Sequence, residues 1–124
     1  MNRLGAEEAT YVAAVTSLYC DLPDTPLRPS PADQAVARKL YQDTVSLSVV
    51  ESALLLATLR RLTRASDLPP LPKVRSLAYF LPVIAEVQQQ PLPDGYLAYL
   101  RLKFQKVSQP DRPGVQKSTF SDDR

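Results

Sequence analysis

The sequence predicts an all-α protein, a small bundle of about five helices around a central buried helix. Three observations predict this fold class. Apolar residues recur three and four positions apart in several segments, which is the spacing of one helix face. No segment alternates apolar and polar residues in the way a half-buried strand requires. Most of the twelve prolines cluster at 23–31, 69–72 and 91–93, where their missing N–H groups mark connections.

The first helix is predicted over residues 7–22, with Glu7 and Glu8 in its first turn, where acids suit the helix dipole. Pro23 ends it at Leu22, because the residue before a proline is biased away from helical backbone angles. Residues 23–31 then predict an extended, polyproline-like segment. We favour a stiff connection lying over the domain; the alternative is a ligand for an aromatic groove on another protein.

A second helix is predicted over residues 31–43, because Ser30 is a good N-cap and Pro31 suits the first helical position. The apolar spacing predicts which of its side chains face the core and which face solvent. The predicted core-facing residues are Ala32, Ala35, Val36, Leu40 and Tyr41, and the predicted outward residues are Gln34, Arg38 and Gln42.

The central helix is predicted over residues 48–64, the most apolar run in the chain. Ser48 and Glu51 have the spacing of a capping box, in which the two side chains satisfy each other's backbone N–H groups. Residues 49–59 are apolar around most of the helix circumference, which predicts burial on nearly all sides. Its last turn is basic, which complements the helix C-terminus.

Residues 73–90 also have a helical apolar stripe, but Pro82 would remove a hydrogen bond inside a regular helix. Either the helix kinks there, or a short turn at 76–80 precedes a helix that begins near Pro82. The predicted stripe consists of Leu77, Phe80, Leu81, Ile84 and Val87.

The last helix is predicted to follow Asp94 as its cap. Its predicted outer side bears Tyr99, Lys103 and Lys106. Its predicted apolar face consists of Tyr96, Leu97, Leu100, Phe104 and Val107. From residue 108 onward the apolar periodicity stops, so we expect a helical domain over residues 1–107 and a flexible tail over 108–124.

The residue inventory argues against an enzyme. Histidine is absent and there is one cysteine, so a zinc site is excluded, and we expect no metal and no cofactor. Three scattered glycines cannot form a phosphate-binding loop. The acidic pairs at residues 7–8 and 122–123 fit solvated surface better than acid and base catalysis. Since no apolar run is long enough to span a bilayer and no secretory signal is evident, we expect a cytoplasmic protein.

Charge is distributed unevenly along the chain. Residues 1–59 hold four Lys and Arg against seven Asp and Glu, a net −3, whereas residues 60–124 hold eleven against six, a net +5. An anionic partner is therefore expected to contact the second half, and cations that meet on one surface would bind phosphates without reading sequence. The predicted nucleic-acid-binding residues are Arg60, Arg61, Arg64, Lys73, Arg75, Tyr99, Arg101, Lys103 and Lys106, with Tyr99 stacking on an unpaired base.

The segments SVVESALLLATLRR and VRSLAYFLPVIAEV resemble the C-terminal module of DnaD-like bacterial replication proteins, with residues 48–62 and 79–87 corresponding. In that module a serine-capped helix is followed by a tyrosine-containing segment that packs back on it and helps to bind DNA. The whole chain, with its closing GYLAYLRLKF, is also similar to small uncharacterised bacterial proteins associated with mobile elements. The resemblance implies a DNA-replication accessory protein.

A second hypothesis is a small structural subunit or adaptor in a larger protein or nucleoprotein assembly. It expects aromatic anchors left exposed on a finished domain. The candidate anchors are Tyr11, Tyr19 and Tyr99. A contiguous exposed apolar patch would favour this hypothesis over nucleic-acid binding.

Overall fold

A computed structural model of the chain describes residues 3–64 and 67–108, which form helices and connections with no strand among them. The elements are α1 Arg3–Cys20, α2 Pro31–Gln42, α3 Leu47–Leu62, the short 3₁₀ helix η1 Leu77–Phe80, α4 Leu81–Gln89 and α5 Tyr96–Ser108. The predicted all-α class is confirmed. The predicted tail lies outside the described residues, except that Ser108 still belongs to α5.

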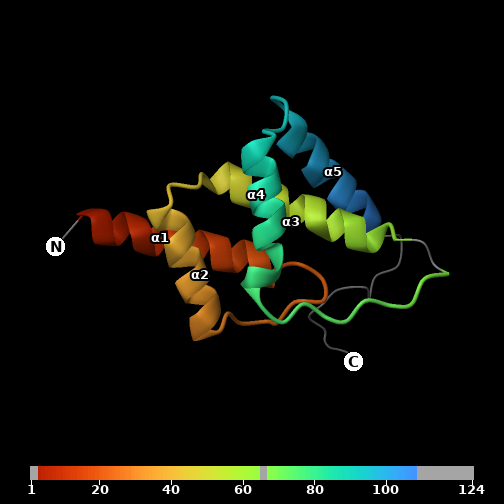
Figure 1. The fold of residues 1–124 in the computed structure, drawn as a ribbon, viewed down its shortest axis with the longest axis horizontal. Helices are drawn as coiled ribbons and strands as arrows, with labels where there is room; N and C mark the ends of the chain where they lie inside the picture. The colour runs from red at the N-terminus through yellow and green to blue at the C-terminus, as the bar shows by residue number, and fades with distance from the viewer. Residues whose placement is uncertain (1–2, 65–66, 109–124) are drawn as a thin grey trace.

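Helix α3 lies at the centre of the fold (Figure 1) and packs against α1, α4, α5 and η1. Helix α2 crosses α1 and packs against it and against η1. Half of α3 is buried, including the two polar residues Ser52 and Thr58. The Thr58 hydroxyl donates to the carbonyl of Leu54 at 2.7 Å, which satisfies it inside the core. The predicted buried central helix is therefore confirmed.

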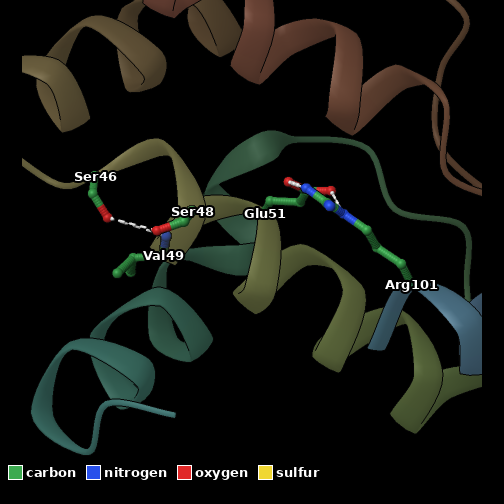
Figure 2. A network of polar contacts seen from close by, with 5 residues as sticks. All are labelled: Ser46, Ser48, Val49, Glu51 and Arg101. Carbon is green, nitrogen blue, oxygen red and sulfur yellow. Dashed lines mark hydrogen bonds and ion pairs between the residues drawn. The ribbon is translucent and has the colours of Figure 1, made fainter. Parts of the chain in front are cut away.

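The start of α3 differs from the prediction (Figure 2). Ser46 is the N-cap, and its Oγ accepts the N–H of Val49 at 3.2 Å. Ser48 lies within the first turn, where its Oγ is 3.3 Å from Ser46 Oγ. The predicted capping box between Ser48 and Glu51 is wrong because the Glu51 carboxylate is paired with Arg101 of α5.

Helix α1 begins at Arg3 and ends at Cys20, so the prediction that Glu7 and Glu8 occupy its first turn is wrong. The predicted apolar face is confirmed, with Val15 and Tyr19 fully buried. The helix ends earlier than Leu22 because Thr25 closes its C-terminus. The Thr25 hydroxyl lies 2.9 Å from the carbonyl of Tyr19 and 2.7 Å from that of Leu22, so it satisfies carbonyls left without helical partners.

Helix α2 starts as predicted, with Ser30 as its N-cap and Pro31 in its first turn. The sequence interpretation missed Asp33, which is 1% exposed and completes a capping box with Ser30. Ala32 and Ala35 are exposed, so their predicted core-facing positions are wrong. The buried face of α2 instead consists of Asp33, Ala37 and Leu40, so the helix is turned about its axis relative to the prediction.

The structure resolves the two alternatives at Pro82 in favour of a short turn. Residues 77–80 form η1, and α4 begins at Leu81 with Pro82 in its first turn, where a missing N–H costs no helical hydrogen bond. The predicted stripe is buried except for Leu81, which is 39% exposed.

Helix α5 follows a turn at Gly95, whose φ of +82° lies in the region that favours glycine. The Tyr96 N–H donates to the carbonyl of Pro93 at 3.0 Å. Leu100 is buried and the other residues of the predicted apolar face pack against the core. In contrast, Tyr99, Lys103 and Lys106 are exposed, as predicted.

Candidate nucleic-acid interface

Four of the eight predicted basic residues bind groups within the fold. Arg60 forms a two-pronged ion pair with Glu86 of α4, with its Nη1 and Nη2 at 3.0 and 2.6 Å from the two carboxylate oxygens. The hydrogen bond to Arg60 lowers the pKa of Glu86 and raises the pKa of the guanidinium. Both side chains are about half exposed. The pair links α3 to α4 and leaves Arg60 partly neutralised.

Arg101 performs the same role between α5 and α3 (Figure 2). Its Nε and Nη2 donate to the two carboxylate oxygens of Glu51 at 2.8 and 2.7 Å. The Glu51 side chain is 18% exposed, which makes this pair less screened by solvent than an ordinary surface pair. The hydrogen bond to Glu51 raises the pKa of Arg101.

Arg61 and Arg64 fasten the end of α3 to the proline-containing connection that follows it. Arg61 donates to the carbonyl of Pro72 at 2.8 Å and to the hydroxyl of Tyr79 at 3.0 Å, and its side chain is only 11% exposed. Arg64 donates to the carbonyl of Pro69 at 2.6 Å. Because proline residues offer a carbonyl but no N–H, a guanidinium is a suitable partner for this segment.

Lys73 and Arg75 project outward from the extended segment that leads to η1. Val74 between them is buried, and its N–H donates to the carbonyl of Asp24 at 2.9 Å. This hydrogen bond holds Val74 against the core. Because side chains of an extended segment point alternately to opposite sides, Lys73 and Arg75 face solvent. No described residue forms an ion pair with either of them.

The outer face of α5, which we define as Tyr99, Leu102, Lys103 and Lys106, is the second exposed basic group. These residues lie three and four positions apart and therefore share one side of the helix. Within the described part of the chain, neither lysine forms a salt bridge, and α5 itself contains no acidic residue. Tyr99 is 50% exposed, and its ring lies against that of Tyr96, with ring centroids 5.2 Å apart.

The eight predicted cations come from three segments of the fold: the end of α3, the connection that follows it, and α5. In Figure 1, α5 lies on one side of α3, and the extended segment 67–76 runs along the other side. Four arginines hold the helices and the connection together. The other four cations are exposed and form two groups, Lys73 with Arg75 and Lys103 with Lys106. The outer face of α5 is the more complete of the two, because it adds an aromatic ring to its two lysines.

Sequence reasoning missed Leu102, which is 64% exposed on the outer face of α5. A helical wheel could have found it, because Leu102 falls beside Lys106 and opposite the apolar face. It also missed a hollow of about 360 Å³ between the end of α3 and the proline-containing connection. No local sequence signal marks this hollow, since it forms between residues that the fold brings together.

No family model, no curated protein and no solved structure matches the chain. The DnaD-like resemblance therefore stays a prediction. Among the residues that the structure describes, no three Cys, Asp or Glu side chains are grouped as a metal site requires. Within the same residues, no helix has the length and apolar character needed to cross a membrane.

Proposed function

We propose that this chain is a non-enzymatic protein that binds the phosphate backbone of nucleic acid through the outer face of α5. The observation that supports this most strongly is the pair Lys103 and Lys106, exposed on an acid-free helix with no described ion-pair partner. Their ammonium groups need no internal interaction to be broken before they contact a phosphate. Arg60 and Arg101, by contrast, would have to leave Glu86 and Glu51.

The chemistry of this face favours single strands and sequence-independent contact. Two lysines attract phosphates as point charges and release counterions, which contributes affinity but no base selectivity. The half-exposed ring of Tyr99 can stack on an unpaired base, an option that a closed duplex does not offer. Lys73 and Arg75 supply a second, weaker group of phosphate contacts. The DnaD-like resemblance extends the proposal to a DNA-replication accessory role.

The test is fluorescence anisotropy of a labelled oligothymidylate, titrated with the full chain over a range of salt concentrations. Binding should weaken steeply with salt. The double variant Lys103→Gln, Lys106→Gln should reduce the slope of log affinity against log salt by about 1.4, since each single-strand phosphate contact contributes about 0.7. Tyr99→Leu should weaken binding to the oligothymidylate by about tenfold while leaving duplex binding unchanged.

A matched control is Lys39→Gln, which removes an exposed lysine from α2. Lys39 pairs with Asp43 on the same helix, and exposed pairs of this kind contribute little to stability. The control should bind like the unaltered chain. Undetectable binding at low salt, or an equal loss in the control and in the α5 double variant, would reject the proposal.

A second candidate function is that of an adaptor that docks on another protein. The hollow at the end of α3 favours it, because Leu62, Leu68 and Leu71 line that hollow and are each more than a third exposed. Of the predicted anchors, Tyr19 is fully buried, so its predicted exposure is wrong. Tyr11 is half-buried and donates to the carbonyl of Val45 at 2.7 Å, which leaves Tyr99 as the exposed one.

A further inference from the structure

The hollow at the end of α3, which we call the arginine hollow, combines an apolar wall with cationic donors. Its volume is about 360 Å³, within the range of pockets that hold small ligands or single side chains. Leu62 of α3 and Leu68 and Leu71 of the connection form the apolar wall, and Arg61 and Arg64 line it as well. Among the described residues that line it, Asp24 is the one carboxylate.

The walls of the arginine hollow are fixed relative to each other. Arg61 of α3 donates to the carbonyl of Pro72, and Arg64, which follows the C-cap of α3, donates to the carbonyl of Pro69. A third bond runs from Arg61 to the Tyr79 hydroxyl, and its guanidinium carbon lies 5.5 Å from the centre of that ring. A hollow held open in this way costs little conformational entropy to fill, because its walls are already ordered.

Arg64 lines the hollow and retains donors that no described residue uses. Its Nη1 donates to Pro69, but no described residue accepts a hydrogen bond from its Nε or Nη2. Asp24 lies 3.6 Å from Arg61 and offsets that guanidinium rather than Arg64. Lys73 and Arg75 stand exposed further along the same connection. The hollow is therefore apolar on one side and net positive on the other.

The wall chemistry decides between classes of partner. Leucine and proline side chains offer no aromatic platform on which a base could stack. Pro69 and Pro70 have no N–H, so an incoming chain cannot extend a backbone ladder here and must be recognised by its side chains. A protein segment satisfies both conditions.

We propose that the arginine hollow docks a short segment of a partner protein, in which one apolar side chain is followed or preceded by an Asp or Glu. The apolar side chain packs against Leu62, Leu68 and Leu71, and the carboxylate accepts hydrogen bonds from Arg64. This inference rests on the adaptor function, the second candidate above. It is independent of the outer face of α5.

The test selects peptides from a random display library on the immobilised full chain, with counter-selection on the variant Leu68→Asp. The expected result is enrichment of peptides with Leu, Ile, Phe or Met beside Asp or Glu. Arg64→Gln should weaken the best peptide by at least about tenfold in calorimetry, the size of a lost charged hydrogen bond. Leu71→Asp should also weaken it, because it places a carboxylate in the apolar wall. Arg38→Gln, an exposed arginine of α2, is the matched control and should bind normally.

Three outcomes would overturn the inference. One is no enrichment over the Leu68→Asp variant, and another is enrichment of basic peptides. The third is displacement of the bound peptide by oligothymidylate, which would make the occupant a nucleic acid. Since Leu71 is 38% exposed, Leu71→Asp should fold even where Arg64→Gln loosens the connection. Lys103→Gln, Lys106→Gln should leave peptide binding unchanged, so the α5 proposal and this one can fail separately.

Discussion

Asp33 should be the most important polar side chain for stability, although it belongs to neither proposed binding surface. One carboxylate oxygen accepts the Ser30 N–H at 2.9 Å, and the other accepts the Leu77 N–H at 2.9 Å. The first bond belongs to the cap of α2, and the second joins α2 to η1 across 44 positions of the chain. One buried carboxylate therefore orders two elements that are distant in sequence.

Asp33→Ala removes both bonds. Loss of the cap should cost about 1 kcal/mol of unfolding free energy. The Leu77 N–H would then be buried without an acceptor, which should cost about 1–3 kcal/mol more. The total expected loss is about 2–4 kcal/mol, a large part of the stability of a small domain.

The assay is urea unfolding followed by circular dichroism, with Ser30→Ala as the matched variant. Ser30→Ala removes the hydroxyl that accepts the Asp33 N–H at 3.1 Å but leaves the bond to Leu77 intact, so it should cost only about 1 kcal/mol. If Asp33→Ala cost no more than Ser30→Ala, the bond to Leu77 would contribute nothing and this reasoning would be refuted.

Three further predictions concern the core and one ion pair. Tyr19→Phe should raise the unfolding free energy by about 1 kcal/mol in the same assay, because the buried Tyr19 hydroxyl has no described hydrogen-bond partner; a loss would show that the hydroxyl is satisfied. Leu55→Asp should lower the melting temperature sharply, at a cost of about 4 kcal/mol or more, since it buries an unpaired charge; an unchanged value would show that Leu55 is not in the core. Arg60 lowers the pKa of Glu86 below its ordinary 4.5, so this pair stabilises the fold above that pH and the contribution is lost as the pH falls through the lowered pKa. Glu86→Gln should therefore lower the melting temperature at pH 7 but leave it unchanged in strong acid, and an equal effect at both would contradict the pairing.

The helices could be predicted from sequence because their signals are local. The spacing of apolar residues and the positions of prolines identified all five α-helices, and Ser30 with Pro31 marked the start of α2 correctly. At Pro82 the local signals allowed two arrangements. The structure forms the one in which the proline occupies a first helical turn and breaks no hydrogen bond.

The errors come from partners that are distant in sequence. Ser48 and Glu51 have capping-box spacing, but Glu51 instead binds Arg101, fifty positions further along the chain. The internal partners of several predicted basic residues could not be predicted for the same reason. A count of cations cannot show that Arg60 faces Glu86 or that Arg61 faces the Pro72 carbonyl. The bond from Leu77 to Asp33 likewise has no local signature.

The account depends on α3 being enclosed by the other helices, because both proposed binding surfaces are positioned by what packs against it. Native-state hydrogen exchange tests this most directly. Amides of residues 53–59 should exchange only through global unfolding, with an opening free energy equal to that from urea unfolding. If these amides instead exchanged as readily as those at the exposed end of α5, α3 would not be the centre of the fold and the account would be contradicted.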